Sequence, residues 1–204
     1  MAKTQEFKAW LEDWNWGDAT DKERWSHLDL INGWTDPGAL TMLNTIVRDF
    51  FQPGDNYLEI GTYCGKSLCG ALQDNQGEAQ VIDPFGLVLP DGDAIEAAWR
   101  RNVAAQGVND RVQLHRSTSQ SFAGKLPLIG LYYYDGSHEV GDTYHGLTTF
   151  EHHLSDRAII IVDDCAMPEV APDIDKYVNT RPQVTLLGQS PFAPYNQAVM
   201  IFER

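Results

Sequence analysis

Short apolar runs alternate with amphipathic stretches along most of the chain. Runs rich in β-branched and aromatic residues predict strands, and apolar residues three and four positions apart predict helices. The predicted helix at 93–106, for example, has Ile95, Ala98, Trp99 and Val103 along one face. The predicted strands are residues 57–63, 80–84, 112–116, 128–134, 158–162, 184–187 and 198–202. Helices are expected at 66–73, 93–106, 139–154 and 173–179.

This alternation predicts an α/β fold with a mostly parallel, seven-stranded sheet that helices cover on both faces. Ligands of such folds bind at the carboxyl ends of the strands, near the point where the strand order reverses. The residues that directly follow the predicted strands are polar or rich in glycine, namely 61–65, Asp83, 117–120, 135–138 and 163–164. We therefore expect the functional site along this edge of the sheet.

The first 38 residues differ from the rest because they hold five of the six tryptophans. Trp10 and Trp14 are four residues apart, so a helix here would present both to the rest of the protein. We interpret residues 1–38 as a helical cap and residues 39–204 as the main domain. Either the cap simply packs its aromatic side chains, or part of it closes over a ligand and supplies an aromatic wall.

Composition and charge exclude several classes of partner for this chain. The net charge of −14 argues against nucleic-acid binding, because phosphates would be repelled. No apolar run approaches the length needed to span a membrane, and the first ten residues lack the apolar core of a secretory signal. The three cysteines show no disulfide or metal-ligand spacing. We expect a cytoplasmic protein with a small-molecule partner, and the sequence leaves a homo-oligomer open.

The stretch YLEIGTYCGKSL, residues 57–68, places an acid and two glycines where a predicted strand passes into a helix. Glycine allows a sharp turn and lets another molecule approach the main chain. Such a loop suits a nucleotide-like ligand, although a turn without any ligand would have the same pattern. Three residues separate Gly61 from Gly65, so the G-x-G-x-x-G pattern of dinucleotide-binding dehydrogenases is absent.

LEIGTYCGKS resembles motif I of the class I S-adenosylmethionine-dependent methyltransferases, in the small O-methyltransferase branch that includes catechol O-methyltransferase. The resemblance covers residues 58–164 and extends to VIDPF, STSQ, YYYDGSH and IVDDC. DGSH followed by VDD also resembles bacterial methyltransferases that act on sugars and secondary metabolites. The resemblance implies a Rossmann-like methyltransferase fold and S-adenosylmethionine as cofactor.

The resemblance also implies cofactor-binding residues. The glycine loop, with Gly61 and Gly65, would pass beneath the methionine part of the cofactor, and Glu59 would orient the loop. Ser67 would hydrogen-bond the methionine carboxylate, and Asp83 would accept hydrogen bonds from the ribose hydroxyls. Ser119 and Gln120 match the family position that meets the adenine. Phe85 either packs on the adenine or packs on the sheet.

Three acids follow two predicted strands: Asp135 after the fourth, and Asp163 and Asp164 after the fifth. Neighbouring strands lie about 4.8 Å apart, so these carboxylates can share one Mg²⁺ or Mn²⁺. The catechol-type enzymes have an Asp-Asn pair at the second position, whereas the sugar-modifying relatives have Asp-Asp as here. In the alternative, the acids cap helices or bind the cofactor amine without a metal. Consecutive strand residues face opposite ways, so Asp163 and Asp164 can both be ligands only where the chain bends.

His138 stands three residues after Asp135, where the catechol-type enzymes carry a lysine base. A histidine there would take the proton of a substrate hydroxyl, or would be merely structural. The sequence thus predicts metal-assisted O-methylation of a small molecule, with Asp135 and His138 in the catalytic site. The alternatives are a metal-free N- or O-methyltransferase and a non-catalytic S-adenosylmethionine-binding protein.

Overall fold

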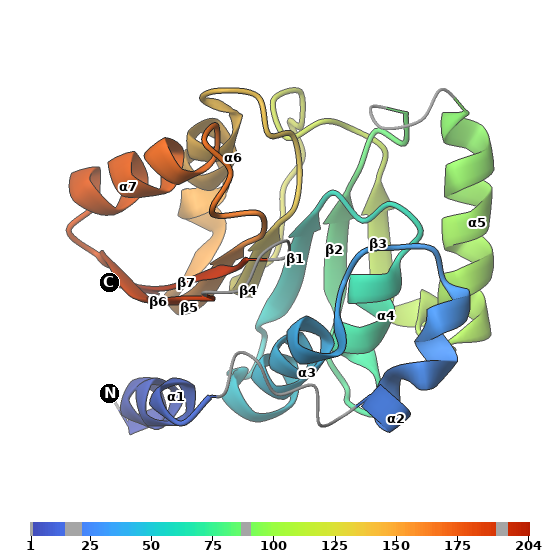
Figure 1. Ribbon diagram of the computed structural model, residues 1–204, viewed down its shortest axis with the longest axis horizontal. Helices are drawn as coiled ribbons and strands as arrows, with labels where there is room; N and C mark the ends of the chain where they lie inside the picture. Colours follow the sequence, from blue (N-terminus) through green and yellow to red (C-terminus); the bar gives the residue numbers. More distant parts are fainter. Residues whose placement is uncertain (1, 15–21, 87–90, 191–195) are drawn as a thin grey trace.

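The computed structural model describes residues 2–14, 22–86, 91–190 and 196–204. In these ranges, seven strands form one sheet in the order β3-β2-β1-β4-β5-β7-β6 (Figure 1). The strands from β3 to β5 are parallel, and β7 is antiparallel to β5 and β6. Their bounds are β1 Asn56–Ile60, β2 Ala79–Ile82, β3 Val112–His115, β4 Ile129–Tyr134, β5 Leu154–Val162, β6 Val184–Gln189 and β7 Ala198–Glu203. The predicted mostly parallel, seven-stranded sheet is confirmed.

Helices cover both faces of this sheet (Figure 1). One face packs against α1 (Ala2–Glu12), α3 (Pro37–Thr45), α4 (Lys66–Leu72) and α5 (Gly92–Ala105). The other face packs against α6 (Asp142–Phe150) and α7 (Ala171–Thr180). The remaining helical elements are α2 Lys22–Trp25, η1 Ser26–Leu30, η2 Ile46–Phe50, η3 Asn109–Arg111 and η4 Glu151–His153.

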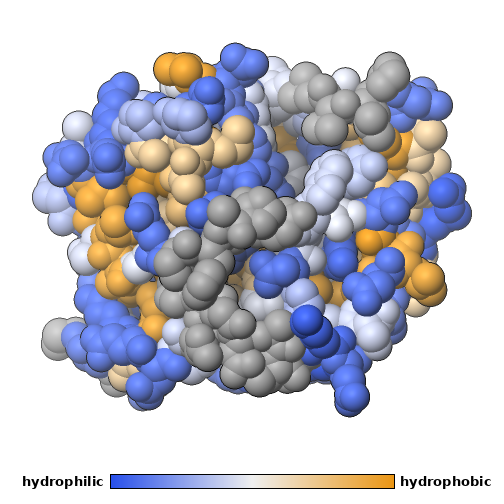
Figure 2. Space-filling model, viewed as in Figure 1, coloured by the Kyte–Doolittle hydropathy of each residue, from blue (hydrophilic) through white to orange (hydrophobic). Residues whose placement is uncertain are grey.

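The central strands β1, β4 and β5 are largely apolar because both of their faces are buried along most of their length. In β4, Leu131 and Tyr133 point into the core beneath α3 and α4, while Tyr132 and Tyr134 point into the core beneath α6. Successive side chains of a strand face opposite ways, so one continuous apolar run supplies two cores. In Figure 2, hydrophilic residues cover most of the visible face, and hydrophobic ones gather on the side of α7, β6 and β7.

The predicted elements differ most from the structure in three regions. The first strand ends at Ile60 rather than at residue 63, because Gly61 turns the chain with a positive φ. The helix predicted at 139–154 is shorter, since α6 ends at Phe150 and Leu154 already begins β5. Helix α3 was not predicted. It begins after Asp36, whose Oδ1 accepts hydrogen bonds from the backbone N–H groups of Gly38 and Ala39.

The N-terminal segment packs at two separate places. Helix α1 lies against η2 and the β6 side of the sheet, with Phe7 and Trp10 on the ring of Phe50. Trp25 is buried further along the segment, and its indole N–H donates to Thr41. Trp16 lies outside the described residues. Within the described ranges, no helix combines the length and apolar character needed to cross a bilayer.

Candidate active site

The carboxyl ends of β1, β4 and β5 lie level with one another. Ile60 pairs with Tyr134, and Tyr134 pairs with Val162. The next residues continue the ladder, since Asp135 N donates to Ile60 O and Asp163 N donates to Tyr134 O, both at 2.9 Å. This register brings the glycine loop and the acids to one edge of the sheet, as the sequence predicted.

Asp135, His138 and Asp164 converge at this edge, each with one possible metal-binding atom within 4.8 Å of the other two. His138 Nε2 lies 3.5 Å from Asp164 Oδ2. The chain bends here because Asp164 has a φ of 52°. The bend turns Asp164 toward Asp135, as a shared site requires.

Asp163 is oriented differently from its neighbour. Its Oδ2 accepts a 2.5 Å hydrogen bond from the Tyr133 hydroxyl, and its Oδ1 accepts one from Asp164 N at 3.0 Å. Burial is the main cause that raises the pKa of Asp163 to about 6, and the charge of Asp164 adds to it. Burial and the charges of Asp163 and Asp164 raise the pKa of Asp135 well above its ordinary value.

The two glycines of the loop have positive φ angles, 80° at Gly61 and 86° at Gly65. A Cβ on Gly61 would overlap the carbonyl oxygen of Asp135. A Cβ on Gly65 would lie 3.0 Å from Cδ1 of Trp99. Gly61 therefore requires glycine for conformation and for space, whereas a side chain at Gly65 would strain the backbone and press on Trp99.

Glu59 is fully buried beneath the loop and ties its two ends together. Its Oε2 accepts from the Tyr57 hydroxyl and its Oε1 from the Ser67 hydroxyl, both at 2.7 Å. Burial raises the pKa of Glu59 to about 7, although these hydrogen bonds act in the opposite direction. The carboxylate thus positions the start of α4, and the Ser67 hydroxyl points inward to Glu59.

Asp83 also supports the glycine loop. Its Oδ2 accepts from the backbone N–H groups of Thr62 and Tyr63, at 2.8 and 3.0 Å, and its Oδ1 accepts from Phe85 N at 2.7 Å. Phe85 is buried and lies 6.2 Å from Trp99, measured between ring centroids.

The short loop after β3 holds the pair expected to meet the adenine. The buried Ser119 donates its hydroxyl to Gln120 Oε1 at 3.1 Å. Neither residue lines the cavities described next.

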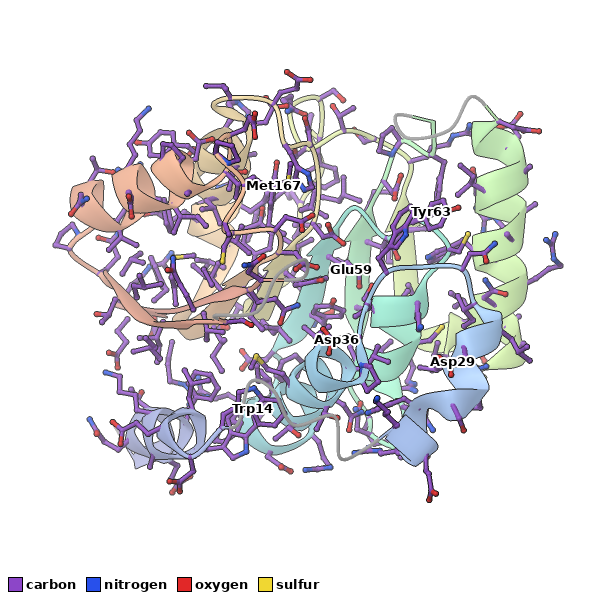
Figure 3. All side chains as sticks on the ribbon, in the orientation of Figure 1. Trp14, Asp29, Asp36, Glu59, Tyr63 and Met167 are labelled. Carbon is purple, nitrogen blue, oxygen red and sulfur yellow. The ribbon has the colours of Figure 1, made fainter. Side chains whose placement is uncertain are left out.

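A cavity of about 140 Å³ opens at the edge where the acids lie. We call residues 31–36, which join η1 to α3, the strap; it covers this cavity. Figure 3 shows Glu59 at the end of β1 and Tyr63 on the loop that follows, with Asp36 at one end of the strap and Asp29 just before the other. The cavity is lined by Asn32, Gly33, Trp34, Thr35, Thr62, Tyr63, Lys66, Ser67, Asp135, Asp163 and Asp164.

Aromatic side chains flank this cavity. The ring of Trp34 stacks on that of Tyr63, with centroids 5.4 Å apart and planes 18° apart. A second cavity, of about 370 Å³, shares Asn32 and Tyr63 with the first and extends toward the start of α5. Among the described residues of the N-terminal segment, only the strap reaches the site, whereas α1 lies elsewhere on the sheet.

Three features of the site were missed in the sequence. Lys66 follows Gly65 directly and is the only basic residue of the stretch YLEIGTYCGKSL, so the sequence did offer a signal for it. Tyr133, beneath Asp163, read as an ordinary core residue of a strand. The place of the strap depends on how α3 packs, which no local pattern indicates.

Residues 58–165, slightly more than half of the chain, match a protein family described as "Methyltransferase domain". The chain belongs to this methyltransferase family. The match spans the glycine loop, Asp83, His138 and the three acids. It confirms the resemblance to class I methyltransferases and identifies the protein as an enzyme of methyl transfer. A search of curated proteins by sequence gave no match.

Solved structures of methyltransferases share the fold of this one. The O-methyltransferase from Bacillus cereus in complex with SAH superposes with a TM-score of 0.68 at 16% identity, over 92% of this chain and 91% of that one. Cofactor-bound Rv0187 from MTB gives 0.64 at 17% identity, over 96% of each chain. The O-methyltransferase TomG from Streptomyces achromogenes, involved in tomaymycin synthesis and bound to SAM, gives 0.59 at 16%, over 94% and 97%. At these identities the likeness confirms the methyltransferase fold.

Proposed function

We propose that this methyltransferase transfers the methyl group of S-adenosylmethionine to a hydroxyl oxygen of a small molecule. The cofactor would lie along the glycine loop, with Gly61 and Gly65 beneath it and Asp83, Ser119 and Gln120 toward its nucleoside. The transfer is a displacement at the sulfonium methyl, so the protein must align the hydroxyl with that methyl and remove its proton.

His138 is the proposed base, and its geometry is the observation that carries the proposal. Its Nε2 is buried at the acid cluster and has no hydrogen-bond partner among the described residues. A neutral imidazole nitrogen in that position can accept the proton of a hydroxyl. The carboxylate of Asp164, 3.5 Å away, would then stabilise the imidazolium that forms.

The acids at this edge fit a divalent cation. Their closeness and burial raise the pKa values of Asp135 and Asp163, and a bound cation would offset that repulsion. Asp135 and Asp164 would hold the cation, with Asp163 as a third carboxylate beside them. Asp163 already accepts hydrogen bonds, but each carboxylate oxygen has more than one acceptor site. Once bound, Mg²⁺ or Mn²⁺ would lower the pKa of the acceptor hydroxyl.

A metal-free N- or O-methyltransferase is the second candidate. The orientation of Asp163 toward Tyr133 favours it, since the protein itself already satisfies this carboxylate. In that case His138 would remove the proton without a cation.

Two measurements separate these candidates. Mn²⁺ binding, followed by electron paramagnetic resonance, should weaken at least tenfold in Asp135→Asn and in Asp164→Asn. With an acceptor found by screening hydroxyl compounds for formation of S-adenosylhomocysteine, chelation should abolish turnover and Mn²⁺ should restore it. Unchanged turnover after chelation would exclude the metal-assisted reaction and support the metal-free methyltransferase.

The role of His138 has its own test. His138→Asn should lower the rate about 10²- to 10⁴-fold, the usual span for a positioned base. S-adenosylhomocysteine affinity should stay the same, because the proposed base would act on the acceptor and not on the cofactor. His145→Asn, the same change at an exposed position on α6, is the matched control. A full rate in His138→Asn would show that the histidine is structural.

A further inference from the structure

Side chains of both charges line the cavity beneath the strap. Asp135, Asp163 and Asp164 are its acidic lining residues, and Lys66 is the cation among the lining residues. The Lys66 side chain is 13% exposed, so the protein covers most of it. The Ser67 hydroxyl, which the sequence assigned to a ligand carboxylate, donates instead to Glu59. The lysine is therefore the group that can meet a negative charge here.

We propose that Lys66 binds the carboxylate of the methionine part of S-adenosylmethionine and selects the cofactor by that group. This inference rests on the proposed function. An α-amino acid carries a carboxylate and an ammonium a few ångströms apart, and the lining of this cavity likewise holds both a lysine and carboxylates. The volume of about 140 Å³ suits such a group rather than a whole nucleoside, because sites for drug-sized ligands measure about 300–1,000 Å³.

Lys66 also makes one of the contacts between α4 and the segment that carries the strap. Its Nζ lies 3.4 Å from Oδ1 of Asp29, which is 71% exposed. A Cβ on Gly33 would lie 3.1 Å from Lys66 Cβ, so the strap packs closely on the lysine stem. Exposed ion pairs contribute little net stability, whereas a carboxylate held inside the cavity interacts more strongly. The ligand carboxylate thus displaces Asp29, and η1 loses this ion pair with α4 when the cofactor binds.

Calorimetry on the full chain tests this assignment with two probes. S-adenosylhomocysteine carries the carboxylate, and S-adenosyl-3-thiopropylamine lacks only that group. Wild-type protein should bind the first about 10- to 100-fold more tightly, the range for a hydrogen bond to a charged group. In Lys66→Met this ratio should fall to near one. Lys66→Arg, which keeps the charge, should hold the ratio above that of Lys66→Met.

The Asp29–Lys66 contact predicts that loss of Asp29 strengthens S-adenosylhomocysteine binding, whereas loss of Lys66 weakens it. Asp29→Asn should raise S-adenosylhomocysteine affinity about two- to threefold, because the competitor for Lys66 is removed. Asp93→Asn, which breaks the exposed pair with Arg116 elsewhere, should leave the affinity unchanged. If wild-type protein binds S-adenosylhomocysteine and Lys66→Met keeps the wild-type ratio of the two affinities, the assignment of Lys66 is wrong. The proposed function would not be affected by that result. Absence of S-adenosylhomocysteine binding by wild-type protein would instead overturn the proposed function, and this inference with it.

Discussion

Glu59→Gln should raise the free energy of unfolding at alkaline pH. At acid pH the same substitution should leave it nearly unchanged. Burial raises the pKa of Glu59 from 4.5 to about 7. A carboxyl whose folded pKa is raised binds its proton more tightly in the folded state. It therefore contributes stability that is complete below pH 4.5 and is lost as the pH rises toward 7. At about 1.4 kcal/mol per pKa unit, the loss in the wild type is on the order of 3 kcal/mol. Glutamine has no proton to lose and still accepts from Tyr57 or Ser67.

Urea unfolding of both proteins from pH 4.5 to pH 8 measures this difference. The free energy of unfolding of Glu59→Gln, relative to wild type, should rise by about 3 kcal/mol across that range. Other titrating groups are present in both proteins and largely cancel. Glu78→Gln, the same substitution at an exposed site, is the matched control. A flat difference for Glu59→Gln would refute the reasoning, because the Glu59 carboxyl would then titrate alike in both states.

Three further predictions concern the support of the site. Gly61→Ala should lower the free energy of unfolding by more than about 2 kcal/mol, since a left-handed backbone costs about 1–2 kcal/mol and the Cβ also overlaps Asp135. Gly54→Ala, with a φ of 90° and open space, should pay only the backbone cost. Tyr133→Phe should cost about 1.5–3 kcal/mol at pH 8 in urea unfolding, and less at pH 5, where Asp163 is protonated. Removal of the residues before Asp36 should lower the thermal midpoint strongly, and an unchanged midpoint would make that segment a mere appendage.

The order of elements and the edge that carries the site could be predicted because they depend on local patterns. Apolar runs with both faces buried are readable, and parallel strands fix the edge where their following loops meet. The missed helix α3 had a local signal as well. Asp36 followed by Pro37 is a helix start, with a capping side chain and a proline in the first turn.

The partners of the site side chains could not be read in the same way. Glu59, Asp83 and Asp163 were each assigned to a ligand or a loop, and in the structure each accepts hydrogen bonds from the protein. A carboxylate has several acceptor sites, and its partners depend on side-chain rotamers and on neighbours distant in sequence. The hydroxyl of Ser67 likewise lies eight residues from Glu59, and only the turn between them brings the two together.

The close approach of Gly61 to the Asp135 carbonyl has a consequence for how this enzyme can change over generations. Any side chain at position 61 collides with the main chain at the end of β4, so a substitution there would need a simultaneous shift of that strand end. Such a shift would also move Asp135, which stands among the acids. A single substitution at position 61 is therefore strongly disfavoured, whereas residues 32–35 of the strap line the cavity beside the acids without belonging to the sheet. Substitutions among these strap residues can reshape the cavity without moving the end of a strand.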